Sequence, residues 1–163
     1  MLAVEKIGRQ TTSLFATVGD ITVAPGLSNV ISGRAELRLD LRHESDDVRE
    51  SAFKEIENSL IEITGARDVS FDLVDIQHSP AVPMDTRLRS ALESAIKAAG
   101  YDPQSMVSGA GHDAMIVASI APAGMLFVRC RDGISHHPDE FVSGDDIRDS
   151  LRVLVTAVAN FAL

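Results

Sequence analysis

The stretch AELRLDLR, residues 35–42, alternates apolar and charged side chains without a break. Successive side chains of a β-strand point to opposite faces, so this alternation predicts a strand with one face in the core and the other charged. Residues 14–23 also suit a strand, and the turn cluster PGLSN (25–29) lies between the two. Because Gly26 can adopt a positive φ at little cost, we expect a turn there and therefore a hairpin.

The residues around this hairpin predict two helices, a further strand and a domain crossing. Residues 2–8 follow a short helical pattern. Residues 45–65 begin with SDD, which offers an N-cap and acids for a first turn, and continue as an amphipathic helix that stops at Gly65. We expect a strand over residues 68–76. The segment QHSPAVPMD (77–85) contains two prolines, and we interpret it as the crossing between two domains.

The second half of the chain continues the alternation of helices and strands. A helix is expected over residues 86–99, where apolar residues recur at helical spacing. Residues 105–120 combine a strand-like start, a glycine-rich bend and an apolar segment that we expect to be helical. GMLFVRC (124–130) is typical of a buried strand, RDGISHHPDE (131–140) of its loop, and residues 143–163 of a capped closing helix. This alternation predicts the α/β class.

Composition limits the possible functions. The chain has 163 residues, 45% of them hydrophobic, which is enough for one globular domain or two small ones. A formal charge of -9 disfavours contact with nucleic acid or anionic lipid. The single cysteine, Cys130, permits no intramolecular disulfide, and no apolar run reaches the roughly 20 residues of a membrane helix. Because residues 1–10 lack a signal-peptide pattern, we expect a soluble, cytoplasmic protein.

Two adjacent histidines in the loop after residues 124–130 are candidates for a metal site. Loops at the carboxyl ends of strands hold many ligand sites of α/β proteins, and neutral imidazole is a common zinc ligand. His136 is therefore a candidate ligand, with Glu140 or Asp139 available for its second ring nitrogen. For His137 we favour a structural role, as a helix cap or a carbonyl partner. A hydrolytic metal site needs three protein ligands and a base, so the residues alone predict only part of a site.

Two further groups of residues suit the binding of a substrate. The bend GAGHD (109–113) lets backbone approach a ligand closely, and His112 is able to donate to a substrate while Asp113 supports it or caps the next helix. A turn with capping residues explains the same pattern. Arg42, grouped with Asn29, lies on the polar face of its strand, where a surface charge is the default, but its planar fork suits a substrate carboxylate.

Three segments, taken in chain order, resemble the motifs of one family. They are VGDITVAPGLSNVISGRAELRLDLRH (18–43), SGAGHDAM (108–115) and GISHHPDE (133–140). Together they resemble the amidase, or hydantoinase/carbamoylase, branch of the dinuclear-metal aminoacylase and carboxypeptidase superfamily. That branch contains the N-carbamoyl-L-amino acid amidohydrolases, the allantoate amidohydrolases and the β-ureidopropionases. The resemblance covers nearly all of the chain, and Ser32 departs from it because the family usually has proline there.

The resemblance implies roles for five residues. It makes His136 a ligand of one of two divalent metal ions, zinc or manganese. It assigns Asn29 and Arg42 to the free carboxylate of a small substrate, and Gly111 and His112 to other substrate contacts. The implied reaction cleaves the carbamoyl or ureido C–N bond of an N-carbamoyl-L-amino acid or of allantoate. These residues do not choose among the substrates, and histidine and carboxylate ligands do not choose the metal.

The resemblance also implies that much of the site lies outside this chain. No catalytic residue is assigned, because the family's general base and other metal ligands lie in an N-terminal half, so we do not expect this chain to retain both metal ions. Residues 1–80 resemble most of a lid or dimerisation domain, an antiparallel sheet with helices, through which a homodimer would form. Residues 85–163 resemble the C-terminal segment of an α/β catalytic domain. The alternative is a catalytically inactive folded fragment that acts as a dimerisation or complementing module, since unpaired strand edges seek partners.

Overall fold

The computed structural model describes residues 1–161. The chain divides into two compact units, Met1–Ala81 and Val82–Leu163. Helices and an antiparallel pair of strands make up the regular structure, in agreement with the α/β class. Within the described residues, no helix has both the length and the apolar composition needed to cross a bilayer.

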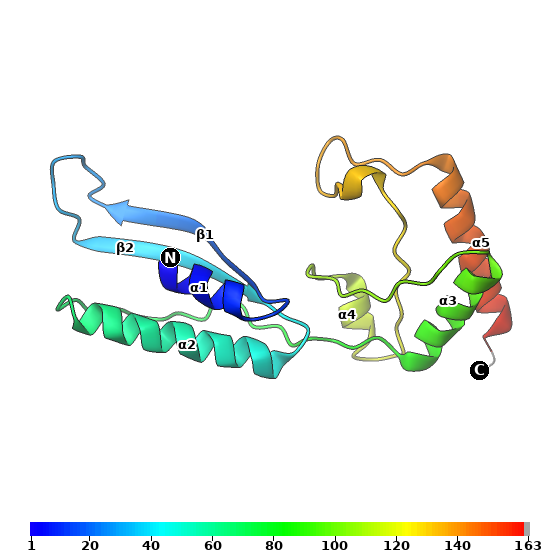
Figure 1. Cartoon of the computed structure of the whole chain (residues 1–163), viewed down its shortest axis with the longest axis horizontal. Helices are drawn as coiled ribbons and strands as arrows, with labels where there is room; N and C mark the ends of the chain where they lie inside the picture. Colours follow the sequence, from blue (N-terminus) through cyan, green and yellow to red (C-terminus); the bar gives the residue numbers. More distant parts are fainter. Residues whose placement is uncertain (162–163) are drawn as a thin grey trace. The chain divides into compact units, whose positions relative to one another are not determined.

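The first unit contains a β-hairpin, as predicted (Figure 1). Strand β1 (Phe15–Ala24) pairs antiparallel with β2 (Arg34–Arg42), and Phe15 lies opposite Arg42. Gly26, in the connecting loop, has a φ of +66°, and a Cβ there would lie 2.9 Å from a backbone carbonyl oxygen. The turn therefore requires glycine at this position.

Two helices supply the core of the first unit. They are α1 (Leu2–Gln10), which continues two residues beyond the predicted end at Gly8, and α2 (Asp46–Gly65), which ends where expected. Figure 1 shows α2 running along the hairpin. The buried cluster consists of Val4, Ile7, Leu14, Ala52 and Ile56. This short list shows that the unit buries few side chains.

The apolar face of β2 is only partly covered, so the prediction of one wholly buried face is wrong. Leu41 packs against the buried cluster together with Ala16 and Val18. Farther along the same strand, Leu37 is 44% exposed and Leu39 is 36% exposed. Leu41 thus belongs to the packed part of this face, whereas Leu37 and Leu39 are not among the residues that pack against the cluster.

Residues 68–76 and 124–130 do not form the predicted strands. In the described part of the chain the sheet consists of β1 and β2, and the backbones of residues 70–76 and 125–129 form no hydrogen bond there. Val74 is 80% exposed, and Phe127, predicted to be buried, is 44% exposed. A strand exists only with a neighbour that accepts and donates its ladder hydrogen bonds, and these segments have none. The strand-like start predicted at residue 105 fails in the same way.

The second unit is built on two helices that pack together (Figure 1). Helix α3 (Thr86–Ala98) and helix α5 (Gly144–Asn160) match the predicted helices, although residues 162–163 of the prediction lie outside the described residues. Ser143 caps α5, because its Oγ accepts from the backbone N–H of Asp146 at 3.0 Å. The buried cluster of this unit consists of Ala95, Val153 and Ala157.

Two short elements lie in the connections of this unit. Helix α4 (Asp113–Val117) follows the glycine-rich bend, as predicted, and the 3-10 turn η1 (Arg131–Gly133) opens the histidine-bearing loop. The residues before each of them, 109–112 and 122–130, belong to no helix or strand. The predicted site residues of this unit therefore lie on connections, and helices α3 and α5 provide its frame.

Candidate functional site

The loop at residues 131–140 holds His136 in an unusual backbone conformation. His136 has a φ of +58°, in the left-handed region that non-glycine residues rarely adopt. Its backbone N–H donates to Oε2 of Glu140 at 2.9 Å. Glu140, proposed from sequence as a partner for the imidazole, thus braces the main chain of the loop. His136 itself is exposed.

His137 and Asp139 interact with each other in the same loop. Nδ1 of His137 accepts from the backbone N–H of Asp139 at 3.2 Å and lies 3.5 Å from Oδ2 of that residue. This contact is local to the loop and differs from the helix cap or carbonyl contact expected from sequence, because the partner of Nδ1 is the N–H of a loop residue.

The donor set of this chain does not fit a metal ion by itself. Among residues 1–161, no group of three His, Cys, Asp or Glu side chains lies close enough together to hold one. A hydrolytic metal ion takes three protein ligands, and Glu140, the acid that lies near His136, is engaged with a backbone N–H. Further ligands would have to come from outside these residues.

The glycine-rich bend brings Ser108 and His112 together. Oγ of Ser108 lies 2.7 Å from Nε2 of His112 and also accepts from the backbone N–H of Ala110 at 3.1 Å. The edge of the imidazole packs against Phe127, with ring centroids 5.9 Å apart and ring planes at 75°. Ser108 was not singled out from sequence, although a serine four residues before a histidine across a GAG bend is a usable signal.

Gly111 is not required by packing within the chain. A Cβ built on Gly111 would meet Sδ of Met115 at 4.0 Å, which is ordinary van der Waals contact. Its φ also lies outside the left-handed region. A need for glycine at this position would therefore come from a molecule that approaches the bend, as the sequence predicts for a substrate-contacting loop.

Arg42 is engaged with Asp40 on the surface of β2. Nε of Arg42 lies 2.9 Å from Oδ1 and 3.0 Å from Oδ2 of Asp40. The hydrogen bond from Arg42 lowers the pKa of the Asp40 carboxyl, and the same bond raises the pKa of the Arg42 guanidinium. Both side chains are about half exposed, at 52% and 48%. Arg42 is thus charged, accessible and already matched to a carboxylate.

The structure does not bring Asn29 and Arg42 together. Asn29 lies in the loop of the hairpin and Arg42 at the far end of β2, where it faces Phe15. A strand of this length, nine residues, separates its ends by about 26 Å. Figure 1 shows the loop and the end of β2 at opposite ends of the hairpin. One small carboxylate cannot contact both residues of the same chain.

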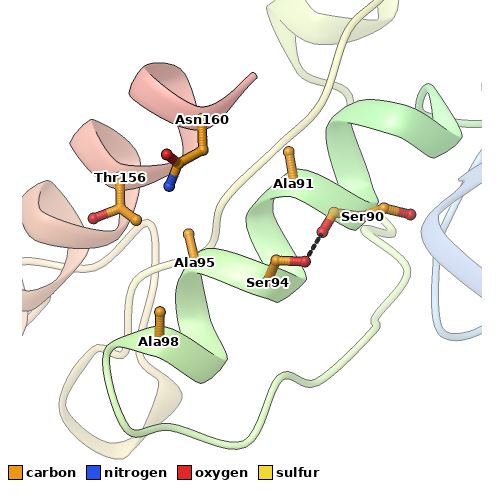
Figure 2. Close-up of a pocket in the computed structure, with 7 residues that line it drawn as sticks. All are labelled: Ser90, Ala91, Ser94, Ala95, Ala98, Thr156 and Asn160. Atoms are coloured by element: carbon orange, nitrogen blue, oxygen red, sulfur yellow. Dashed lines mark hydrogen bonds between the residues drawn. The ribbon is translucent and has the colours of Figure 1, made fainter. Parts of the chain in front are cut away.

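One hollow of the second unit lies away from the predicted site residues. It is a groove between α3 and α5, lined by small residues, and Figure 2 shows Ser94 donating to the carbonyl of Ser90 on its α3 side at 2.8 Å. Its lining consists of Ser90, Ala91, Ser94, Ala95, Ala98, Thr156 and Asn160. These side chains offer no titratable group, so we do not regard the groove as the reactive site.

Residues 5–160 match the family described as Peptidase family M20/M25/M40. The chain is 36% identical over 159 residues to an N-carbamoyl-L-amino acid amidohydrolase of Geobacillus stearothermophilus, covering 98% of this chain and 39% of that protein. It is 39% identical over 145 residues to allantoate deiminase 2 of Glycine max, covering 84% of this chain and 30% of that protein.

Solved structures give the same result. A hydantoinase/carbamoylase family amidase of Burkholderia multivorans matches with a TM-score of 0.87 and 34% identity, covering 94% of this chain and 38% of the amidase. The chain thus spans less than two fifths of the length of the relatives that it matches. These relatives are hydrolases of C–N bonds, and the family match takes in almost every residue from α1 to α5. On this evidence the chain belongs to peptidase family M20/M25/M40 and is similar to the amidases within it.

Proposed function

We propose that this chain is part of a metal-dependent amidohydrolase that cleaves the carbamoyl or ureido C–N bond of an N-carbamoyl-L-amino acid or of allantoate. The observation that carries the proposal is the similarity to a named N-carbamoyl-L-amino acid amidohydrolase over 98% of this chain. The similarity to an allantoate deiminase over 84% of the chain keeps the second substrate open. A cytoplasmic location is part of the proposal, supported by the single cysteine, which fits a reducing compartment.

In this proposal His136 is a metal ligand, and Gly111 and His112 contact the substrate. The exposure of His136 and its braced backbone support the first role, since a ligand must present its imidazole on a fixed main chain. The second role rests on the resemblance of SGAGHDAM (108–115) to the substrate-contacting loop of the family. The remaining metal ligands and the general base would lie outside these 163 residues, so we assign no proton transfer to a residue of this chain.

The separation of Asn29 and Arg42 along β2 supports a carboxylate site shared by two copies of the chain. In such a site one copy supplies Asn29 and the other supplies Arg42, so that the two side chains contact the same substrate carboxylate. This arrangement requires a dimer that places hairpin against hairpin. Arg42 suits the role because its planar fork already binds the carboxylate of Asp40 through two nitrogens, Nε to Oδ1 and Nη2 to Oδ2.

The experiment that tests the proposal is an ammonia-release assay with N-carbamoyl-L-amino acids and allantoate in the presence of zinc or manganese. The chain is assayed alone and mixed with a polypeptide carrying the part of the Geobacillus stearothermophilus relative that it does not match. We expect no release from the chain alone and release from the mixture. His136→Ala should abolish that release, whereas His137→Ala should leave most of it. A mixture that associates and binds metal but releases no ammonia from either substrate class would contradict the proposal.

The shared carboxylate site has its own test in that mixture. Asn29→Ala and Arg42→Ala should each raise KM strongly, because each removes binding of a group remote from the scissile bond. Combining the two variant chains should restore part of the turnover, since some mixed dimers then contain one intact site. Two variants that stay inactive in combination, although they form mixed dimers, would place both residues in one copy or outside the site.

A second candidate function is that of a dimerisation or complementing module without activity of its own. The observation that favours it is the backbone of residues 70–76 and 125–129, which forms no hydrogen bond in the described structure. Unpaired extended segments are templates for strands of another chain. Light scattering of the 163-residue chain should then show a dimer or a larger species. A clean monomer over the accessible concentration range would count against this candidate.

A further inference from the structure

Ser108 and His112 form a pair of side chains whose hydrogen bond determines where the imidazole carries its proton. Nε2 of His112 lies 2.7 Å from Oγ of Ser108. In a neutral imidazole one nitrogen is a donor and the other an acceptor, so a partner that fixes one nitrogen also fixes the other. The direction of the Ser108–His112 bond therefore decides which nitrogen of His112 bears hydrogen.

The geometry around Oγ of Ser108 favours the hydroxyl as the donor. A distance of 2.7 Å is typical of O–H donors, whereas N–H donors lie most often at about 2.9–3.0 Å from their acceptors. The other acceptor within reach of the hydroxyl, the carbonyl of Ala110, is farther away, at 3.1 Å. Oγ also accepts from the backbone N–H of Ala110 at 3.1 Å, which fixes the oxygen itself in the bend.

Phe127 restrains the ring from a second side. The two rings meet edge to face, with centroids 5.9 Å apart and planes at 75°. This contact comes from residues 124–130, the segment on the other side of α4 in the sequence, so the ring is held by two separate parts of the second unit. The ring of His112 thus has one hydrogen-bond partner, Ser108, and one aromatic contact, Phe127, from two segments of the second unit.

We propose that Ser108 is a positioning residue that holds neutral His112 as the Nδ1–H tautomer, so that Nδ1–H is the donor offered to a substrate oxygen. The substrate oxygen would be that of a carbamoyl, ureido or carboxylate group, and this part rests on the proposed function. The free histidine side chain prefers the Nε2–H tautomer, so the bond to Ser108 reverses the ordinary preference. Ser108 itself need not touch the substrate.

The test is nuclear magnetic resonance of the 163-residue chain labelled with 15N-histidine. Spectra are recorded near pH 8.5, about two units above the ordinary histidine pKa, so that the rings are neutral. Long-range proton–nitrogen correlations distinguish a protonated ring nitrogen from an unprotonated one. His112→Gln identifies the signals of His112 among the five histidines of the chain. We expect Nδ1 of His112 to be protonated and Nε2 to be unprotonated.

Substitutions at Ser108 then separate a positioning role from a merely structural one. Ser108→Ala should shift His112 to the Nε2–H tautomer, and Ser108→Thr, which keeps the hydroxyl, should retain the Nδ1–H form. Ser119→Ala is the matched control, because Ser119 is a serine of the same unit whose Oγ donates to the carbonyl of Ile116 at 2.7 Å. It should leave the His112 signals unchanged. Far-UV circular dichroism checks that each variant keeps its helices.

Two results would overturn the proposal. One is an Nε2–H tautomer for His112 in the unsubstituted chain, which decides the matter even if Ser108→Ala does not fold. The other is an Nδ1–H tautomer that persists in a folded Ser108→Ala chain. Both readings are independent of turnover, so a failed ammonia-release assay would remove the proposed function and leave the tautomer assignment standing. In an active mixture, Ser108→Ala should lower kcat/KM about tenfold or more, and Ser108→Thr should restore it.

Discussion

Arg42 binds the carboxylate of Asp40, its second neighbour on β2, through Nε at 2.9 Å and 3.0 Å from the two oxygens. Residues two apart on a strand share a face, so the pair forms without any tertiary contact. A substrate carboxylate that approaches Arg42 must therefore share the guanidinium with Asp40 or displace it.

The titration of Asp40 should reveal this pair. The hydrogen bond from Arg42 lowers the pKa of Asp40 in the folded chain. The stabilisation is thus present above the pKa of the unfolded chain and is lost as pH falls through the lower, folded value. Carboxyl 13C signals of Asp40 should titrate below the ordinary aspartate range, and Arg42→Ala should raise the midpoint toward that range. Arg34→Ala, at the other end of β2, should not; equal effects would disprove the pairing.

The capping serine of α5 should matter more than the serine at the same position of α2. Ser143→Ala removes an Oγ that accepts from the backbone N–H of Asp146, which should cost about 1 kcal/mol of unfolding free energy. Ser45 occupies the N-cap of α2, but in the described structure its side chain forms no capping hydrogen bond. Ser45→Ala should therefore cost less. Urea unfolding followed by circular dichroism compares the two, and a larger loss for Ser45→Ala would contradict the assignment.

Ile56 should be the sensitive position of α2. Its side chain is 4% exposed within the core of the first unit, and truncation to alanine leaves a cavity as well as removing apolar contact. Ile56→Ala should reduce the unfolding free energy by about 2–5 kcal/mol. Phe53, on the same helix but 40% exposed, gives the control, and Phe53→Ala should cost clearly less. Similar losses in urea unfolding would mean that Phe53 is covered in solution.

Amide hydrogen exchange should divide the extended segments into two classes. Amides that bridge β1 and β2 should exchange slowly, and those of residues 70–76 and 125–129 should exchange almost as fast as in an unstructured peptide. In the active mixture the second class should gain protection, because new strands would pair with it. Slow exchange at residues 125–129 in the chain alone would show that the segment finds partners without help.

Local patterns predicted the parts of the fold whose physical causes are local. The hairpin follows from alternation in residues 35–42 and from Gly26, and helices α2, α3 and α5 follow from apolar spacing, with the predicted cap of Ser143 on α5. The cap predicted at the start of α2 is wrong, because the Ser45 side chain forms no capping hydrogen bond. The strands at residues 68–76 and 124–130 were wrong because a ladder needs a neighbour, and periodicity in one segment carries no information about the presence of the other.

The residue types of the candidate site could be predicted from the sequence, but most of their arrangement in space could not. His112 and His136 stand out in sequence because imidazole serves both as ligand and as donor. The role of Ser108 depends on the bend that brings its Oγ close to Nε2 of His112. The four-residue spacing of the two side chains suggests this contact only once the bend is known. The distance between Asn29 and Arg42 follows from the hairpin register, once residues 25–33 are known to form its loop.

The segment GMLFVRC (124–130), which forms no strand in the described structure, also affects the tendency of the chain to aggregate at high concentration. It combines four apolar residues and a cysteine with one charge, it has no proline, and the backbones of its residues 125–129 form no hydrogen bond in the described structure. Such a segment can stack with copies of itself into cross-β aggregates. The chain in isolation therefore carries its own route to inclusion bodies, and any condition that supplies a cognate strand would improve its solubility before it restores any chemistry.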